Sequence, residues 1–292
     1  MCRIKLTFLS IILLVFLCLD LSAQQNPIEI IKKTVVFIGE LNEKNEPEYY
    51  GTGFLVSIDS IRHLVTAKHV VMENINDRFT GKMIDNEYRV FFNKKDKSLG
   101  SHAIVEIKRL LNVKWIFHSN PNVDLAIIPF GVDTTKDDVD AIPNAFFMTS
   151  KRLFELYNIY FLSYQPELAL STRINPILRT GSISLLNEDN TFYIDAFAFP
   201  GNSGSPVFLT PSSIRFDNPG VFNINDPLGH NFIGIIGAYI PYREIAISLQ
   251  TKRPRVVFEE NTGLAKVWSI EYLNEITQSQ EFKAQLNSLL KK

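Results

Sequence analysis

The feature that most constrains the fold is a succession of short runs rich in β-branched and aromatic residues. Clusters of Gly, Asn, Asp or Lys bound these runs, which is typical of strands and turns. The predicted strands are 34–38, 50–57, 63–66, 88–92, 103–107, 115–117, 125–130, 157–162, 177–186, 191–197, 205–209, 232–240 and 264–268. They form two sets of about six, and no helices alternate with them. The pattern therefore predicts an all-β chain built as sandwiches or barrels rather than a parallel sheet.

The end of the chain has a different period. From Ile270 to Leu290, apolar residues recur at spacings close to one helical face, and Ser269 stands where an N-cap is expected. We predict a C-terminal α-helix at 269–290 that packs on the body of the protein. A helix that binds a separate partner is the less favoured interpretation.

The first residues resemble a secretory signal peptide. Arg3 and Lys5 precede an almost unbroken apolar run at 6–19, and small residues follow, ending at Ala23. This order of charged, apolar and small residues predicts a bacterial signal peptide at 1–23, cleaved after Ala23, and hence a secreted or periplasmic protein. A retained anchor is the alternative, although the run is shorter than the roughly 20 residues that span a bilayer.

The cysteines and the net charge limit what kind of exported protein this can be. A lipoprotein anchored through Cys18 is disfavoured because the bulky Leu17 precedes it. Cys2 and Cys18 are the only cysteines, so the chain after cleavage has no disulfide and rests on its core alone. Removal of 1–23 moves the net charge from -1 to -2, which gives no basic excess for nucleic acid as a partner. No later segment is long and apolar enough to span a membrane, so we expect no stable membrane span after signal cleavage.

A turn at 199–207 carries the first chemical signal. It places two prolines and two glycines around Ser203, between apolar strands. A simple tight turn is one interpretation. The other is a nucleophile turn, in which small neighbours expose the Ser203 hydroxyl and the NH groups of Gly201 and Ser203 converge to stabilise an oxyanion. This second interpretation requires a histidine and a carboxylate elsewhere in the chain.

His69 is the histidine whose surroundings suit a catalytic base. It follows the strand end at 64–68, and Val70 and Val71 are placed to anchor a short helical turn. The neighbouring strand at 51–56 would complete a hairpin that holds His69 rigidly at its rim. A general base needs such rigidity because its ring nitrogen must stay within hydrogen-bond reach of the nucleophile.

Asp124 opens an apolar strand, where its carboxylate is expected to be partly buried. Burying a carboxylate without a partner is costly. The residue could simply begin the strand as a turn residue. Alternatively, bonded to an imidazole, it would hold the tautomer whose free nitrogen accepts a proton from a serine.

Three motifs together resemble those of the trypsin-like (chymotrypsin-fold) serine proteases. They are Thr66-Ala67-Lys68-His69-Val70, Asp124-Leu125-Ala126 and Gly201-Asn202-Ser203-Gly204-Ser205-Pro206, in that order. The bacterial branch with the glutamyl endopeptidases and the HtrA-type proteases is the most similar. The resemblance implies one protease domain at 24–292, made of two perpendicular six-stranded antiparallel β-barrels. The first is at about 30–135 and the second at about 155–268, and the active site lies in the cleft between them.

Some positions depart from the family pattern. Animal enzymes place an aspartate before the serine, where it pairs with a newly freed N-terminus on activation, whereas this chain has Asn202. We therefore expect no activation through that salt bridge. Glutamate-specific relatives carry a histidine on the strand where this chain has Ile235 and Ile236, so a preference for glutamate is not supported. No PDZ domain follows, so the full HtrA architecture is not expected.

The resemblance also places the primary substrate pocket. Its candidate lining residues are Phe197, Ala198, Ile236, Ala238 and Tyr239, none of which is charged. A preference for an uncharged substrate side chain follows. The sequence has no Cys and His set with zinc spacing, and the inferred chemistry requires neither a metal nor another cofactor.

The resemblance and the motifs together predict a secreted serine endopeptidase. His69, Asp124 and Ser203 are the candidate catalytic triad, with Gly201 and Ser203 as the oxyanion hole and a protein or peptide as substrate. The main alternative is a catalytically inactive binding protein with the protease fold. An esterase or lipase is disfavoured because those folds order the triad as serine, acid and histidine, whereas this chain has the order His, Asp, Ser.

Overall fold

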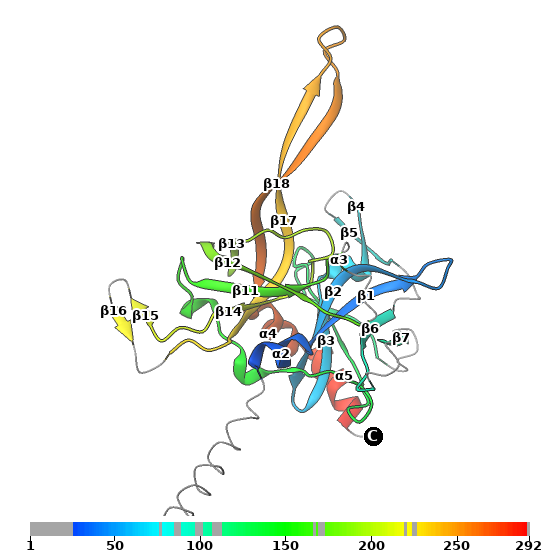
Figure 1. The fold of residues 1–292 in the computed structure, drawn as a ribbon, viewed down its shortest axis with the longest axis vertical. Coiled ribbons are helices and arrows are strands. Elements are labelled where there is room, and N and C mark those ends of the chain that lie inside the picture. The colour runs from blue at the N-terminus through cyan, green and yellow to red at the C-terminus, as the bar shows by residue number, and fades with distance from the viewer. Residues whose placement is uncertain are drawn as a thin grey trace, which may run out of the picture.

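The protein is mostly β-structure, as the sequence predicts (Figure 1). The computed structural model describes residues 26–75, 78–84, 89–96, 102–106, 113–165, 168, 173–218, 221–223 and 227–290. The predicted signal peptide at 1–23 lies outside these residues. Among the described residues, no helix is long and apolar enough to cross a membrane.

The first half of the chain builds one eight-stranded sheet. Its strands are β1 (Val35–Leu41), β2 (Pro47–Ile58), β3 (Ile61–Thr66), β6 (Arg89–Asn93), β7 (His102–Glu106), β8 (Ile116–Phe117), β9 (Ala126–Pro129) and β10 (Ile142–Pro143). The strand order is β7-β6-β1-β2-β3-β9-β8, and β10 pairs with β2. The β10 pairing is parallel, unlike the antiparallel arrangement expected. Within the described residues this path does not close, so a closed first barrel stays a prediction.

The second half forms a closed six-stranded barrel, as predicted. Its order is β11-β12-β13-β18-β17-β14. The strands are β11 (Asn158–Ser163), β12 (Ile177–Leu186), β13 (Thr191–Asp195), β14 (Pro206–Leu209), β17 (Phe232–Ile247) and β18 (Pro254–Ser269). All neighbours in it are antiparallel.

Two short hairpins and several short helices lie outside the two main sheets. The hairpins are β4 (Met72–Ile75) with β5 (Arg78–Met83), and β15 (Arg215–Asn218) with β16 (Val221–Asn223). The short helices are α2 (Pro27–Lys32), α3 (Lys68–Val71), η4 (Asn144–Phe146) and η5 (Ser150–Arg152). The only one of them that bears on the site is α3, which follows directly on β3.

The core joins the two halves instead of separating them. One buried cluster fills the first-half sheet around Leu55 and Leu64, and a second fills the closed barrel around Phe161 and Phe192. The largest cluster spans both halves, and includes Phe54 from β2 packed edge-to-face on Phe232 from β17, with ring centroids 5.1 Å apart. The halves are therefore held in a fixed relation, which a site shared between them requires.

The predicted C-terminal helix is present, but it is broken in two. The chain forms α4 (Ile270–Gln278) and α5 (Gln280–Leu290), with Ser279 in extended conformation between them. The Ser279 hydroxyl accepts a hydrogen bond from the amide of Phe282 and so caps α5. Ser269, the predicted cap, makes no side-chain capping bond. The apolar stripe is buried as expected, and Phe282 belongs to the cluster that spans both halves.

Candidate active site

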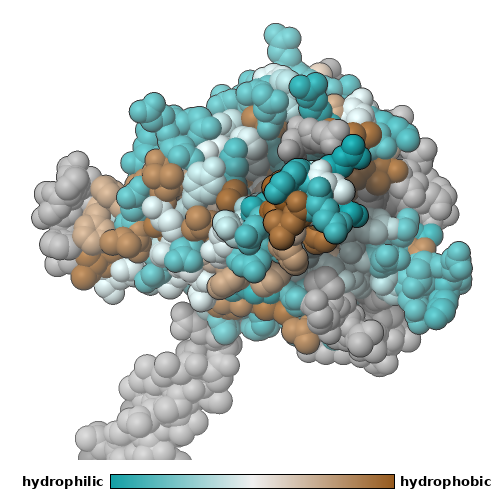
Figure 2. Space-filling model, turned by 90° about the horizontal axis from the view of Figure 1, so that it is seen from above, coloured by the Kyte–Doolittle hydropathy of each residue, from teal (hydrophilic) through white to brown (hydrophobic). Residues whose placement is uncertain are grey.

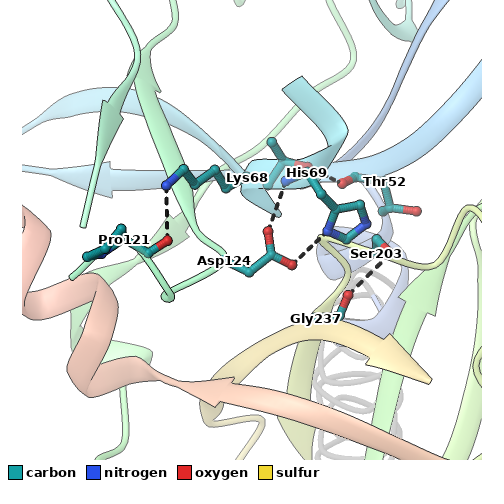
Figure 3. Close-up of polar contacts among 8 residues, drawn as sticks. Thr52, Lys68, His69, Pro121, Asp124, Ser203 and Gly237 are labelled. Atoms are coloured by element: carbon teal, nitrogen blue, oxygen red, sulfur yellow. Dashed lines mark hydrogen bonds and ion pairs between the residues drawn. The ribbon is translucent and has the colours of Figure 1, made fainter. Parts of the chain in front are cut away.

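His69 lies on α3, directly after the end of β3. The neighbouring Val70 and Val71 are buried and anchor this short helix in the first-half core. The His69 side chain remains 31% exposed. The strand end and the buried valines therefore hold the imidazole at the edge of the first half, with one side open to the second half (Figure 3).

Asp124 binds His69 through both carboxylate oxygens. Its Oδ1 accepts a hydrogen bond from the backbone NH of His69 at 2.9 Å, and its Oδ2 lies 2.6 Å from Nδ1 of the ring. Buried Val123 and Leu125 flank Asp124 and fix the segment that precedes β9. A proton on Nδ1 satisfies this short contact and leaves Nε2 free to accept another, which is the tautomer that a general base requires.

The same carboxylate controls the charge of the ring. Burial is the largest effect and lowers the pKa of His69, whereas the hydrogen bond and the negative charge of Asp124 raise it. The two effects of Asp124 together exceed that of burial, so the pKa of His69 lies above its ordinary value. Asp124 thus stabilises the imidazolium that forms when the ring takes up a proton.

Lys68 is a supporting residue that the sequence analysis did not single out. Its ammonium is buried, donates to the carbonyl of Pro121 at 3.2 Å and lies 4.1 Å from the ring centroid of Phe79. Burial lowers the pKa of Lys68, although the charge of Asp124 opposes this effect. Because Pro121 precedes Asp124 by three residues, the contact ties the loop that carries the carboxylate to the helix that carries His69. Nothing in the sequence around Lys68 indicates that it supports the loop of Asp124.

Ser203 lies in the turn between β13 and β14, at the edge of the closed barrel. Its hydroxyl donates to the backbone carbonyl of Gly237 on β17 at 3.3 Å. In Figure 3 the His69 ring lies between Asp124 and Ser203. The structure therefore brings together all three residues that the sequence singles out, with Asp124 bonded to His69 and Ser203 beside the ring.

Glycines at both sides of Ser203 adopt the left-handed conformation, with φ of 91° at Gly201 and 85° at Gly204. A Cβ on Gly204 would lie 2.1 Å from the carbonyl oxygen of Thr52, so only glycine fits there. Among the described residues, the NH groups of Gly201 and Ser203 have no acceptor within the chain. Two such free NH groups in one turn are what an oxyanion hole requires.

Thr52, on β2, holds this turn from the opposite half. Its NH donates to the carbonyl of Ser203 at 3.0 Å, and its hydroxyl donates to the carbonyl of Gly201 at 2.8 Å. The same hydroxyl accepts a hydrogen bond from the amide of Tyr164 at 3.0 Å. Thr52 therefore fixes two peptide groups of the serine turn. From the sequence alone Thr52 is only a strand residue, because its partners in the serine turn are about 150 residues away.

Asn202 is fully buried, and both polar atoms of its side chain are hydrogen-bonded. Its Oδ1 accepts a hydrogen bond from the amide of Phe199 at 2.9 Å, and its Nδ2 donates to the carbonyl of Tyr164 at 2.7 Å. A neutral amide thus holds the turn at the position where animal relatives carry a charged aspartate. This arrangement needs no cationic terminus.

The five residues expected to line the substrate pocket face different surroundings. Ala198 and Ile236 are buried in the core of the closed barrel, and Tyr239 packs partly against it. Phe197 is 56% exposed and stacks on Phe199, and Ala238 is also exposed. Phe197 and Ala238 are therefore the members of the set that a substrate can reach directly, and the pocket as a whole stays a prediction.

The part of the chain that the structure describes holds no group of three or more His, Cys, Asp or Glu side chains arranged to bind a metal ion. The local chemistry is that of a hydroxyl, an imidazole and a carboxylate beside two free NH groups. Such an arrangement can carry out acyl transfer.

Comparison with known proteins identifies the class. The family model of the trypsin-like peptidase domain matches residues 51–212, more than half of the chain, and the match includes His69, Asp124 and Ser203. The chain therefore belongs to the trypsin-like peptidase family, and it is a serine endopeptidase by class. Among solved structures, the serine endoprotease from Yersinia pestis matches at 14% sequence identity and a TM-score of 0.45, covering 88% of this chain and 67% of that chain. No curated protein matches the sequence.

Proposed function

We propose that this chain is a secreted endopeptidase that cleaves peptide bonds with Ser203 as nucleophile, His69 as general base and acid, and Asp124 as the group that orients His69. The observation that carries the proposal is the pair of hydrogen bonds that Asp124 accepts from the backbone NH and Nδ1 of His69, which leaves Nε2 of the ring free on the side of Ser203. The family's two-barrel architecture, with a closed first barrel, is part of the same proposal.

In the first half of the reaction, Ser203 Oγ turns from the Gly237 carbonyl toward Nε2 of His69. It then attacks the carbonyl carbon of the substrate as its proton passes to Nε2. The developing oxyanion accepts hydrogen bonds from the NH groups of Gly201 and Ser203. His69 next donates the proton to the leaving amine, the C–N bond breaks, and an acyl-enzyme ester remains on Ser203.

In the second half, water replaces the amine. His69 takes a proton from the water as it attacks the ester carbonyl, and the same two NH groups hold the second oxyanion. The proton then returns to Ser203 Oγ as the ester bond breaks, and the acid product leaves. Asp124 keeps its hydrogen bond to Nδ1 throughout and balances the positive charge on the ring.

Labelling with a fluorophosphonate probe tests the proposal. We expect the wild-type protein to react and Ser203→Ala to remain unlabelled, with peptide turnover reduced by at least about 10³-fold. Ser205→Ala is the matched control, because Ser205 lies in the same turn and its buried hydroxyl has no hydrogen-bond partner among the described residues. A folded wild-type protein that does not label would support the inactive binding protein instead. Equal turnover in Ser203→Ala would exclude the proposed nucleophile.

Secretion and specificity need separate experiments. Expression of the full chain in a bacterial host should yield an exported protein that begins directly after Ala23, as N-terminal sequencing would detect; an uncleaved cytoplasmic product would contradict export. Profiling with a peptide library should show a preference for uncharged residues before the cleaved bond. Strong cleavage after Arg, Lys or Glu would contradict the proposed pocket.

A further inference from the structure

A long two-stranded hairpin projects from the closed barrel (Figure 1). It consists of residues 241–261, the outer parts of β17 and β18, and we call it the outer hairpin. Its strands pair with each other from Tyr242 opposite Glu260 to Ile247 opposite Pro254. The pairings of β17 with β14 and of β18 with β13 involve only residues nearer the barrel. In the described structure, both outer edges of this hairpin are therefore unpaired.

Large apolar side chains cover the outer hairpin, yet they remain at least half exposed. They are Leu249 at 86%, Val257 at 58%, Ile247 at 57%, Tyr242 at 56%, Phe258 at 55%, Ile245 at 54% and Val256 at 50%. Figure 2 looks down on this region and shows hydrophobic side chains flanked by hydrophilic ones.

The apolar residues occupy both faces of the ribbon. Successive residues of a strand point to opposite faces, so Val256 and Phe258 share one face and Val257 lies on the other. The chain itself buries neither face. An isolated two-stranded hairpin is at best marginally stable in water, and exposed apolar patches of this kind mark interaction sites. The outer hairpin is therefore a candidate docking surface.

The charges on β18 and on the turn before it indicate which partner. Lys252, Arg253 and Arg255 precede the apolar residues 256–258, and Glu259 and Glu260 follow them. The three cations form no ion pair with any residue that the structure describes. One half of the segment is thus basic and the other acidic, with an apolar centre. Glu259 also pairs with Arg243 at 2.8 Å and accepts a hydrogen bond from Tyr239 within its own hairpin, so a cation from a second copy would join an existing charge pair. Two copies laid antiparallel about Val257 would bring the basic half of each beside the acidic half of the other, with Arg255 the one cation directly opposite an acid.

We propose that the outer hairpin pairs with the outer hairpin of a second copy of this chain, β18 against β18, antiparallel about Val257. In this register Arg255 of each copy faces Glu259 of the other, and Val256 faces Phe258. Opposite charges and β-branched with aromatic side chains are favourable cross-strand pairs. The contact is symmetric, as a two-fold dimer requires, and it joins the two hairpins into one four-stranded sheet.

The length of the hairpin fits this pairing. Val257 lies opposite Ile245, about midway between the base of the hairpin at Pro241 and its turn at Gln250. When two hairpins cross at Val257, each turn therefore reaches the base of the other, and the two barrels stay at opposite ends. Pro254 lacks an amide hydrogen, so the ladder between copies ends beside Arg255.

A membrane is a less suitable partner for the same surface. The unpaired NH and C=O groups along both edges would enter hydrocarbon without hydrogen bonds, which is unfavourable. A second copy instead supplies acceptors and donors along the β18 edge. The outer hairpin is also connected to the candidate active site. Strand β17 continues from the hairpin to Gly237, whose carbonyl accepts a hydrogen bond from Ser203. Pairing of the hairpins braces the strand beside the proposed nucleophile.

Sedimentation velocity over a dilution series of the full purified protein tests the proposal with two charge-reversed variants. The cation-reversed variant carries Lys252→Glu, Arg253→Glu and Arg255→Glu, and the acid-reversed variant carries Glu259→Lys and Glu260→Lys. We expect the wild type to form a dimer and each variant alone to be a monomer, with the dissociation constant raised at least about 100-fold. An equimolar mixture of the two variants should form a heterodimer, because opposite charges again face each other.

A control variant with Lys44→Glu, Lys151→Glu and Lys283→Glu reverses three exposed charges elsewhere and should remain a dimer. The cation-reversed variant loses no ion pair within the described chain, so its melting curve should match that of the wild type at a dilution where the wild type is monomeric. The acid-reversed variant loses the Arg243–Glu259 pair and should melt somewhat lower. The proposal is overturned if the wild type stays monomeric at every concentration, or if both reversed variants still dimerise. Binding of a monomeric wild type to phosphatidylglycerol vesicles, lost on cation reversal, would identify a membrane partner and also overturn it.

Discussion

Acid should destabilise the protein through His63, a histidine on β3 that has no place in the proposed mechanism. Its side chain is fully buried and packs on the ring of Phe282 in α5, with ring centroids 4.9 Å apart. Nδ1 lies 3.0 Å from the carbonyl oxygen of Ile61, whereas Nε2 has no partner among the described residues. A second proton would therefore place an unpaired charge in the core. Burial lowers the pKa of His63 to about 4, although the Ile61 carbonyl and the charge of Asp59 oppose it.

The sign and size of the effect follow from linkage. The unfolded chain takes up the proton near pH 6.5, and the folded protein does so only near pH 4. Between these values the unfolded state binds more protons, so the free energy of unfolding falls as the pH is lowered from about 7 to about 4. A shift of about 2.5 units corresponds to about 3 kcal/mol. Because Phe282 anchors α5 on the strand that leads to His69, this loss also loosens the support of the site.

Urea denaturation at several pH values measures the effect, with His63→Gln as the comparison because glutamine does not titrate and keeps a donor for the Ile61 carbonyl. Titrating groups that both proteins share, such as His69, contribute equally to the pH dependence of the free energy of unfolding and cancel when the two proteins are compared. Between pH 7 and pH 4 the wild type should lose about 3 kcal/mol more than the variant. If the free energy of unfolding falls equally with pH in the two proteins, the reasoning is refuted, since His63 would then have the same pKa in the folded and unfolded states.

Three further predictions concern the site itself. Thr52→Val keeps the side-chain shape but leaves the Gly201 carbonyl and the Tyr164 amide without the hydroxyl, and should lower kcat about 10- to 100-fold with little change in KM; a change confined to KM would contradict a positioning role. Asn202→Asp replaces an amide donor with a buried carboxylate that faces the Tyr164 carbonyl, so fluorophosphonate labelling should fall sharply; full labelling would show that the amide is not needed. Because the pKa of His69 is raised, kcat/KM should decline with acid at a pH above the usual histidine value; a decline centred below that value would contradict the geometry.

The strands of the two halves could be predicted because burial leaves a local signature. Runs such as 50–57 and 157–162 combine β-branched and aromatic residues with flanking turn residues, and both become strands. The outer hairpin was not predicted, because its strands have apolar residues on both faces and no buried side to impose an alternating pattern. The break at Ser279 is not predicted either, since the apolar spacing continues across it, although the Ser279 hydroxyl caps α5 through the amide of Phe282.

By itself, the sequence determined the chemical groups and their order along the chain. His69, Asp124 and Ser203 stand out because each lies beside the beginning or the end of a strand, with small or apolar neighbours that hold it locally. How these residues meet depends on the packing of the two halves, which brings both oxygens of Asp124 to His69 and bonds Thr52 to the turn of Ser203 from the other half. Local patterns report the burial and turn preferences of neighbouring residues. Contacts across 55 or 149 positions depend on how the two halves pack, which no local pattern records.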